Sequence, residues 1–242
     1  MGFTIALAQC RRPEDDDVVR NVRRFAQRAA AAGADLLVFP EALMTRFDGS
    51  VERFAATAEP RDGSFARAVD AVAAEFELWV VYTMNERNPE GLPFNTAVVT
   101  DSAGMQQGFY RKMHLFDKQG ENESRYTSAG DAFMRPVETP FARIGLGICY
   151  DLRFPEVSHA AVDAGANLML YPSAWVAGPD KVNQWKTLLR ERAIETGMVV
   201  VGVSSVDPNR TGHSTVFAPD GTELATSDGA EQLVTCEIAT QE

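Results

Sequence analysis

The stretch "RIGLGICYDLRFPE", residues 143–156, joins an apolar run to a charged one at a single cysteine. The apolar residues that end at Ile148 predict a buried strand, and the polarity changes directly after Cys149. Two interpretations of this cysteine are open. It packs at the end of the strand, as buried cysteines often do, or the strand presents it as a nucleophile at its tip.

Similar patterns extend over the rest of the chain and predict its fold class. Hairpin patterns are mixed with strand–helix–strand crossovers, and strands outnumber helices. This combination predicts an α/β protein with mixed sheets and outer helices, in a single domain over residues 1–242. Helices are expected at residues 15–32, 64–76, 156–165 and 181–196, and strands at residues 3–9, 35–40, 78–84, 144–148, 167–174, 198–205 and 232–239, with hairpins within 93–112 and 213–226.

The composition limits the partners. The 242 residues carry 34 acidic and 23 basic side chains, for a formal net charge of −11. Nucleic acid and anionic membranes attract basic patches, so this charge argues against either as the main partner. A small anionic substrate held by one arginine remains compatible with it. No apolar run approaches the roughly 18 residues of a membrane helix.

The cysteines and histidines indicate the compartment and the absence of a metal site. Three cysteines lie far apart without a C-x-x-C pair, so at least one is unpaired within the chain. This usage fits a reducing compartment, and we expect the cytoplasm. Cys10 and Cys236 lie in apolar alternation and are expected in the core. The three histidines show no metal-binding spacing, and no metal or cofactor is expected.

Three strand ends carry reactive side chains. Glu41 follows "LLVFP", Lys112 stands in "GFYRKMHLF", and Cys149 follows "LGI". Each also has a plainer interpretation. Glu41 would suit the first turn of a helix, and Lys112 beside Arg111 would suit a solvated face. Taken singly, these signals do not distinguish a catalytic site from ordinary structure.

The ordered set of motifs is more specific than any member alone. The chain contains "FPEALM" around Glu41, "YRKMHLF" around Lys112 and "GICYDLRFPE" around Cys149, together with "FNTAVV", "YPSAW", "RERAIET" and "GHSTVFAPDG". Over nearly its whole length it resembles the nitrilase superfamily of carbon–nitrogen hydrolases. The resemblance implies a four-layer αββα sandwich of two mixed β-sheets with helices on the outer faces.

The resemblance also implies a division of roles. Cys149 would be the nucleophile, Glu41 the general base and Lys112 the electrostatic partner of the reacting carbonyl. The backbone N–H of Tyr150 would help to hold the oxyanion. A second glutamate of the family site corresponds to Glu123 in "ENESRYTSAG", although this acidic loop also fits a solvated surface. Such a thioester mechanism needs neither metal nor organic cofactor.

A narrower resemblance concerns the substrate. "CYDLRFPE" is similar to the branch that hydrolyses ω-amides of short dicarboxylic or 2-oxo acids, including deaminated glutathione. It implies that Arg153 binds a substrate carboxylate and that Trp175 lines the pocket. The chain departs from the branch at "VAGPDKVNQW", where Gln184 precedes Trp185. The family further implies a small-molecule amide as partner and a homodimer or higher homo-oligomer.

Other function classes remain open. Within the superfamily, these are a nitrilase, an N-carbamoyl amino acid hydrolase or an amidotransferase-type domain. Outside it, they are a thiol redox protein that uses Cys149, a cysteine–histidine protease and a non-catalytic binding module. The classes differ in one observable: the leading interpretation requires Glu41, Lys112 and Cys149 to converge within hydrogen-bonding reach.

Overall fold

Two six-stranded sheets form the centre of the molecule. The computed structural model describes residues 2–11, 17–45 and 51–239. One sheet contains, in order, β12 (Gln232–Ala239), β1 (Gly2–Gln9), β2 (Leu36–Val38), β3 (Trp79–Glu86), β4 (Phe94–Thr100) and β5 (Gln106–Arg111). The other contains β11 (Glu223–Thr226), β10 (Thr215–Phe217), β9 (Val199–Ser204), β8 (Leu168–Ser173), β7 (Arg143–Leu146) and β6 (Val137–Glu138).

Both sheets are mixed, in the same pattern. The three consecutive strands β1, β2 and β3 are parallel, and so are β7, β8 and β9. The flanking pairs in each sheet are antiparallel. Parallel neighbours need crossover connections, whereas antiparallel neighbours can follow through short turns. The prediction of mixed sheets is therefore confirmed.

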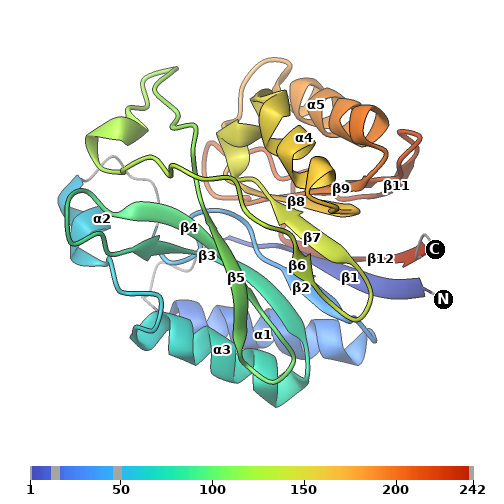
Figure 1. Ribbon diagram of the computed structural model, residues 1–242, viewed down its shortest axis with the longest axis horizontal. Helices are drawn as coiled ribbons and strands as arrows, with labels where there is room; N and C mark the ends of the chain where they lie inside the picture. The colour runs from blue at the N-terminus through green and yellow to red at the C-terminus, as the bar shows by residue number, and fades with distance from the viewer. Residues whose placement is uncertain (1, 12–16, 46–50, 240–242) are drawn as a thin grey trace.

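Helices cover the outer face of each sheet and complete four layers (Figure 1). The first sheet is covered by α1 (Val18–Ala31) and α3 (Ser64–Phe76), and the second by α4 (Pro155–Asp163) and α5 (Lys181–Thr196). Shorter helices are α2 (Val51–Ala56) and the 3-10 turns η1 (Glu123–Arg125) and η2 (Cys149–Arg153). Of the helix expected over residues 15–32, residues 15 and 16 lie outside the described ranges. None of the described helices is long and apolar enough to cross a membrane.

Strand β1 shows why a strand of this sheet can be apolar at nearly every position. Its side chains alternate between two cores, because successive residues of a strand point to opposite faces. Phe3, Ile5 and Leu7 pack between the two sheets, whereas Ala6 and Ala8 pack toward α1 and α3. Both faces of β1 are therefore buried, and this strand contributes side chains to two cores at once.

The ends of several strands meet at one edge of the sandwich. Glu41 follows β2, Lys112 follows β5, Cys149 lies just beyond β7, and Ala174 follows β8. The backbone N–H of Ala174 donates a hydrogen bond of 2.9 Å to Oε2 of Glu41, which joins the ends of two strands from different sheets. This edge is the natural place for a site, because open α/β sheets bind ligands beyond the carboxyl ends of their strands.

Candidate active site

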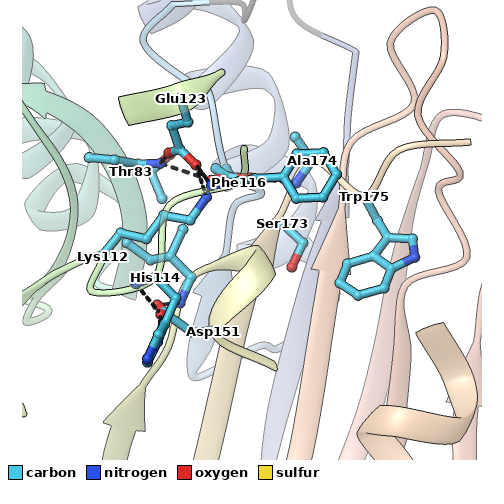
Figure 2. A network of polar contacts seen from close by, with 12 residues as sticks. Thr83, Lys112, His114, Phe116, Glu123, Asp151, Ser173, Ala174 and Trp175 are labelled. Carbon is cyan, nitrogen blue, oxygen red and sulfur yellow. Dashed lines mark hydrogen bonds and ion pairs between the residues drawn. The ribbon is translucent and has the colours of Figure 1, made fainter. Parts of the chain in front are cut away.

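The structure gathers Glu41, Lys112 and Glu123 into one buried cluster. Nζ of Lys112 donates to Oε1 of Glu41 at 2.9 Å and to Oε2 of Glu123 at 2.7 Å. Figure 2 shows the contact between Lys112 and Glu123. The three side chains are only 2–4% exposed. The Cys149 thiol interacts electrostatically with the Glu41 carboxylate and the Lys112 ammonium, so all four side chains belong to one cluster.

Glu41 lies in a turn and begins no helix. The next residue, Ala42, has φ of 61°, a left-handed conformation that interrupts any regular element. The side chain of Thr83 on β3 holds this turn: its hydroxyl donates to the carbonyl of Pro40 at 3.0 Å and accepts from the N–H of Leu43 at 3.3 Å. The turn thereby directs the carboxylate toward Lys112.

Lys112 is buried at the end of the edge strand β5, so the solvated-face interpretation does not hold. Its N–H donates to the carbonyl of Asn95 at 2.9 Å, and its carbonyl accepts from the N–H of Gly130 at 2.8 Å. The side chain is 2% exposed. Arg111, its neighbour, points the other way and pairs with Glu86 at 2.8 Å.

Asn95 is a member of the cluster that the sequence reasoning missed. Its Nδ2 donates to Oε1 of Glu41 at 2.8 Å and to Oε1 of Glu123 at 3.3 Å. The amide thus bridges the same two carboxylates as the lysine. "FNTAVV" had marked this strand as part of the resemblance, but a lone asparagine in a strand carries no signal of its own.

Cys149 lies in a strained turn just beyond β7. Its φ of 47° is uncommon for a residue with a side chain and costs about 1–2 kcal/mol. Gly147 makes the approach possible, because a Cβ there would lie 2.5 Å from Cε1 of Tyr171. The thiol is therefore not packed at the end of a regular strand but is held by the first residue of η2.

Asp151 fixes this turn and was also missed. One carboxylate oxygen accepts from the N–H of Ile148 at 2.9 Å and from the Tyr110 hydroxyl at 3.0 Å. The other accepts from the N–H of His114 at 2.9 Å and contacts Nδ1 of the same histidine at 2.8 Å (Figure 2). The carboxylate is fully buried and joins the Cys149 turn to the segment that follows Lys112.

The pKa values of the Cys149 thiol and the Glu41 carboxylate are shifted in opposite directions. Burial and the charge of Glu41 raise the pKa of the Cys149 thiol well above its ordinary value. Burial alone would also raise the pKa of Glu41, but the charge of Lys112 and the hydrogen bonds of Lys112, Cys149 and Asn95 outweigh it and lower that pKa. The pair therefore rests as a neutral thiol beside an ionised acceptor for its proton.

Lys112 and Glu123 complete the charge pattern. Burial alone would lower the pKa of Lys112, but the charges of Glu123 and Glu41 raise it well above the ordinary value. Burial and the charge of Glu41 raise the pKa of Glu123, and the charge of Lys112, which lowers it, offsets only part of this increase. Lys112 thus stays cationic between the two glutamates, and Glu41 is the one whose pKa is lowered.

A cavity with an empty volume of about 490 Å³ opens onto this network. Glu41, Lys112, Glu123 and Cys149 line its inner end. The rest of the lining is formed by Phe116, Glu121, Tyr126, Tyr150, Arg153, Ala174, Trp175, Val176, Lys181 and Arg210. All seven sequence-predicted site residues therefore line one cavity.

Arg153 and Trp175 stack on each other in the lining of this cavity. The guanidinium of Arg153 lies 4.9 Å from the centre of the Trp175 ring, and one of its nitrogens donates to Oε1 of Gln184 at 2.9 Å. Trp175 lies on the far side of the site from Lys112 (Figure 2). The structure thus separates an inner end with the thiol from an outer end with the arginine.

The remaining thiols lie away from the site. Cys10 and Cys236 are free and buried, as is Cys149. Burial raises the pKa of Cys10, with the charges of Glu231 and Asp207 adding to it. In the described part of the chain, no group of three or more histidine, cysteine, aspartate or glutamate side chains is placed to hold a metal ion.

The four layers and the thiol–carboxylate–ammonium network define an enzyme-like site at the edge of an αββα sandwich. A model of the carbon–nitrogen hydrolase family matches residues 4–242, and the chain belongs to this family of C–N bond hydrolases.

Named relatives are similar in sequence to this chain over most of their length. The deaminated glutathione amidase of Rattus norvegicus is 35% identical over 233 residues, which cover 88% of this chain and 69% of the rat protein. The human omega-amidase NIT2 is 31% identical over 250 residues, covering 98% of this chain and 88% of its own length. The crystal structure of Saccharomyces cerevisiae Nit3, a nitrilase-superfamily member, matches with a TM-score of 0.88 at 26% identity, over 98% of this chain and 90% of that chain.

Proposed function

We propose that this protein hydrolyses the C–N bond of a small ω-amide that carries a carboxylate, releasing the acid and ammonia through a thioester on Cys149. One observation carries the proposal: the thiol of Cys149, the carboxylate of Glu41 and the ammonium of Lys112 line one cavity, with Lys112 hydrogen-bonded to Glu41 and the thiol in the electrostatic field of both. The amidase names of the rat and human relatives support the same reaction class.

The acylation half begins with proton transfer. Because the pKa of the Cys149 thiol is raised and that of Glu41 is lowered, the thiol attacks only as Glu41 takes its proton. Such positioned proton transfer is worth about 10²–10⁴-fold in rate. A C–S bond forms at the amide carbon. Lys112 and the backbone N–H of Tyr150 stabilise the resulting oxyanion.

The intermediate then collapses and is hydrolysed. The C–N bond breaks as protonated Glu41 returns its proton to the departing ammonia, which leaves a thioester on Cys149. Glu41 next accepts a proton from water, and the hydroxide adds to the thioester carbon. The C–S bond breaks, the thiolate recovers a proton from Glu41, and the acid departs. Glu123 and Asn95 position Lys112 and Glu41 throughout.

Arg153 gives the substrate its expected class. A guanidinium binds a carboxylate through two parallel hydrogen bonds, and this one lies in the outer part of the cavity over the Trp175 ring. Trp175 supplies the apolar wall beside the carbon chain. A structural role for Arg153 through pairing with the nearby Asp151 or Glu156 has no support: both carboxylates contact His114, and Arg153 contacts Gln184.

The competing classes receive less support from the site. The charged groups that act on the thiol are Glu41 and Lys112, and no histidine is among them, which disfavours a cysteine–histidine protease. Cys149 has no disulfide partner in the described chain, which disfavours a redox role. Nitrile and N-carbamoyl substrates would use the same thiol and are outcomes of the test.

Ammonia release from a panel of substrates tests the proposal. The panel contains succinamate, butanamide, butyronitrile and an N-carbamoyl amino acid. We expect succinamate to be preferred and the Cys149→Ala variant to retain less than about one part in 10⁴ of the wild-type rate. The Cys10→Ala variant is the matched control and should remain active. Activity in folded Cys149→Ala would overturn the assignment of the nucleophile.

Assembly and location are further parts of the proposal. We expect residues 1–242 to act as one catalytic domain, in a homodimer or higher homo-oligomer, in the cytoplasm. The family resemblance supports the oligomer, and the three unpaired cysteines support a reducing compartment. Light scattering on the purified protein measures the oligomeric state, and a monomeric mass would refute that part.

A further inference from the structure

The outer end of the cavity contains two cations of different origin. Arg153 comes from η2, and Lys181 is the first residue of α5, within the segment "VAGPDKVNQW" that departs from the family branch. Both line the catalytic cavity, and both also line an adjoining basin with an empty volume of about 850 Å³. A substrate that reaches Cys149 from the basin passes both residues.

Trp175 fixes the two cations relative to each other. Its indole N–H donates to the backbone carbonyl of Lys181 at 3.1 Å, and its ring lies under the Arg153 guanidinium at 4.9 Å. Gln184, one helical turn after Lys181, accepts from Arg153 at 2.9 Å. Arg153 is thus tied to the same end of α5 that carries Lys181.

The charges at this end are unbalanced. Arg210, another cation in the lining, has an acidic neighbour, Glu121, at 3.6 Å. In the described ranges of the chain, neither Arg153 nor Lys181 forms an ion pair with a carboxylate. Partial burial, and then the charge of Arg153, lower the pKa of Lys181. Two like charges held close together are unfavourable until an anion lies between them.

We propose that Lys181 and Arg153 together bind the carboxylate of the substrate, and that Lys181 is a specificity-determining residue of this enzyme for monoamides of dicarboxylic acids. This inference rests on the proposed function and deepens it. Lys112 is not available for that carboxylate, because it already bonds to Glu41 and Glu123. The substrate amide therefore enters toward Cys149 with its carboxylate held at the outer end.

The kinetic test compares Lys181→Gln with Lys118→Gln. Lys118 lines the basin but not the catalytic cavity, which makes it a matched control for net charge. We expect Lys181→Gln to lower the ratio of kcat/KM for succinamate to that for butanamide about five- to tenfold, mainly through KM for succinamate, as the loss of a partly exposed charged contact implies. Lys181→Arg should restore most of the ratio, and Lys118→Gln should leave it within about twofold. An unchanged ratio in Lys181→Gln would overturn the inference.

A binding measurement separates this inference from the proposed function. Calorimetric titration of succinamate into Cys149→Ala reports affinity without turnover, and we expect the double variant Cys149→Ala/Lys181→Gln to bind about five- to tenfold more weakly. Equal affinity would refute the role of Lys181 even if the enzyme is an amidase. Weaker binding would support it even if turnover of succinamate fails.

Discussion

The inner and outer ends of the cavity differ in how their charges are balanced. At the inner end Lys112 lies between Glu41 and Glu123, and all three side chains are 2–4% exposed. At the outer end Arg153 and Lys181 are partly exposed and have no carboxylate partner in the described residues. A paired, buried cluster needs no ligand to be stable, whereas unpaired cations gain from one. We infer that the inner end performs the chemistry and the outer end selects the substrate.

The largest effect is expected from removing the cation of the inner end. Lys112→Ala should lower kcat about 10²–10³-fold, because the ammonium stabilises the oxyanion of the transition state. It should also lower the free energy of unfolding by about 3–5 kcal/mol, since it leaves two buried carboxylates without their partner. Steady-state kinetics and denaturant unfolding measure the two effects.

A double variant separates the two roles of Lys112. Lys112→Ala combined with Glu123→Gln removes one of the uncompensated charges and should recover part of the stability, but none of the activity. Near-normal kcat in a folded Lys112→Ala protein would contradict the division between the two ends.

A smaller effect is expected at the outer end. Arg153→Leu should raise KM for succinamate about 10- to 100-fold and change kcat/KM for butanamide much less, because a charge-assisted contact is lost only with the first substrate. The melting temperature should stay near that of the wild type. An equal loss on both substrates together with a lower melting temperature would make Arg153 a structural residue.

The smallest effect on stability is expected at His114, which contacts Asp151 below the Cys149 turn. The pKa of His114 is raised, first by its hydrogen bond with Asp151 and then by the charges of Asp151 and Glu156. Partial burial and the charge of Lys112 act in the opposite direction but are outweighed. A raised histidine pKa stabilises the fold fully below the ordinary value of about 6.5, and this contribution is lost as the pH rises through the higher folded-state value. Over that window the melting temperature should fall by at most roughly 2–4 °C.

Melting curves across this pH range decide the point. His114→Gln should lose this part of the pH dependence, whereas His159→Gln, a variant on the more exposed side of α4, should keep it. The same slope in His114→Gln and the wild type would show that the histidine does not contribute.

The fold was predictable because it depends on local patterns. The helices expected at residues 64–76 and 181–196 have those bounds in the structure: α3 buries one apolar face, and α5 ends directly before Gly197, which has φ of 66°. The mixed sheets followed from hairpins among crossovers. The strand expected through residue 148 instead ends at Leu146, because Gly147 passes against Tyr171 and the chain turns at Cys149.

The site was predictable only where a motif marked it. The family resemblance located Glu41, Lys112 and Cys149, and it placed Glu123 in a loop with no regular pattern of its own. Asn95 and Asp151 were missed because, apart from the local bond of Asp151 to Ile148, the hydrogen bonds that give them their roles reach residues from 28 to 54 positions away. Such partners are set by how the strands pack, and no local spacing records them.

The central claim is tested most directly by measuring how the acyl group on Cys149 divides between hydroxylamine and water. Succinamate and monomethyl succinate have different leaving groups but would give the same thioester on Cys149. With hydroxylamine present, the account predicts that both substrates yield succinic monohydroxamate and succinate in the same ratio, because one common intermediate divides between hydroxylamine and water. Different ratios from the two substrates, or hydrolysis without any hydroxamate, would contradict a shared acyl-enzyme and with it the nucleophilic role of Cys149.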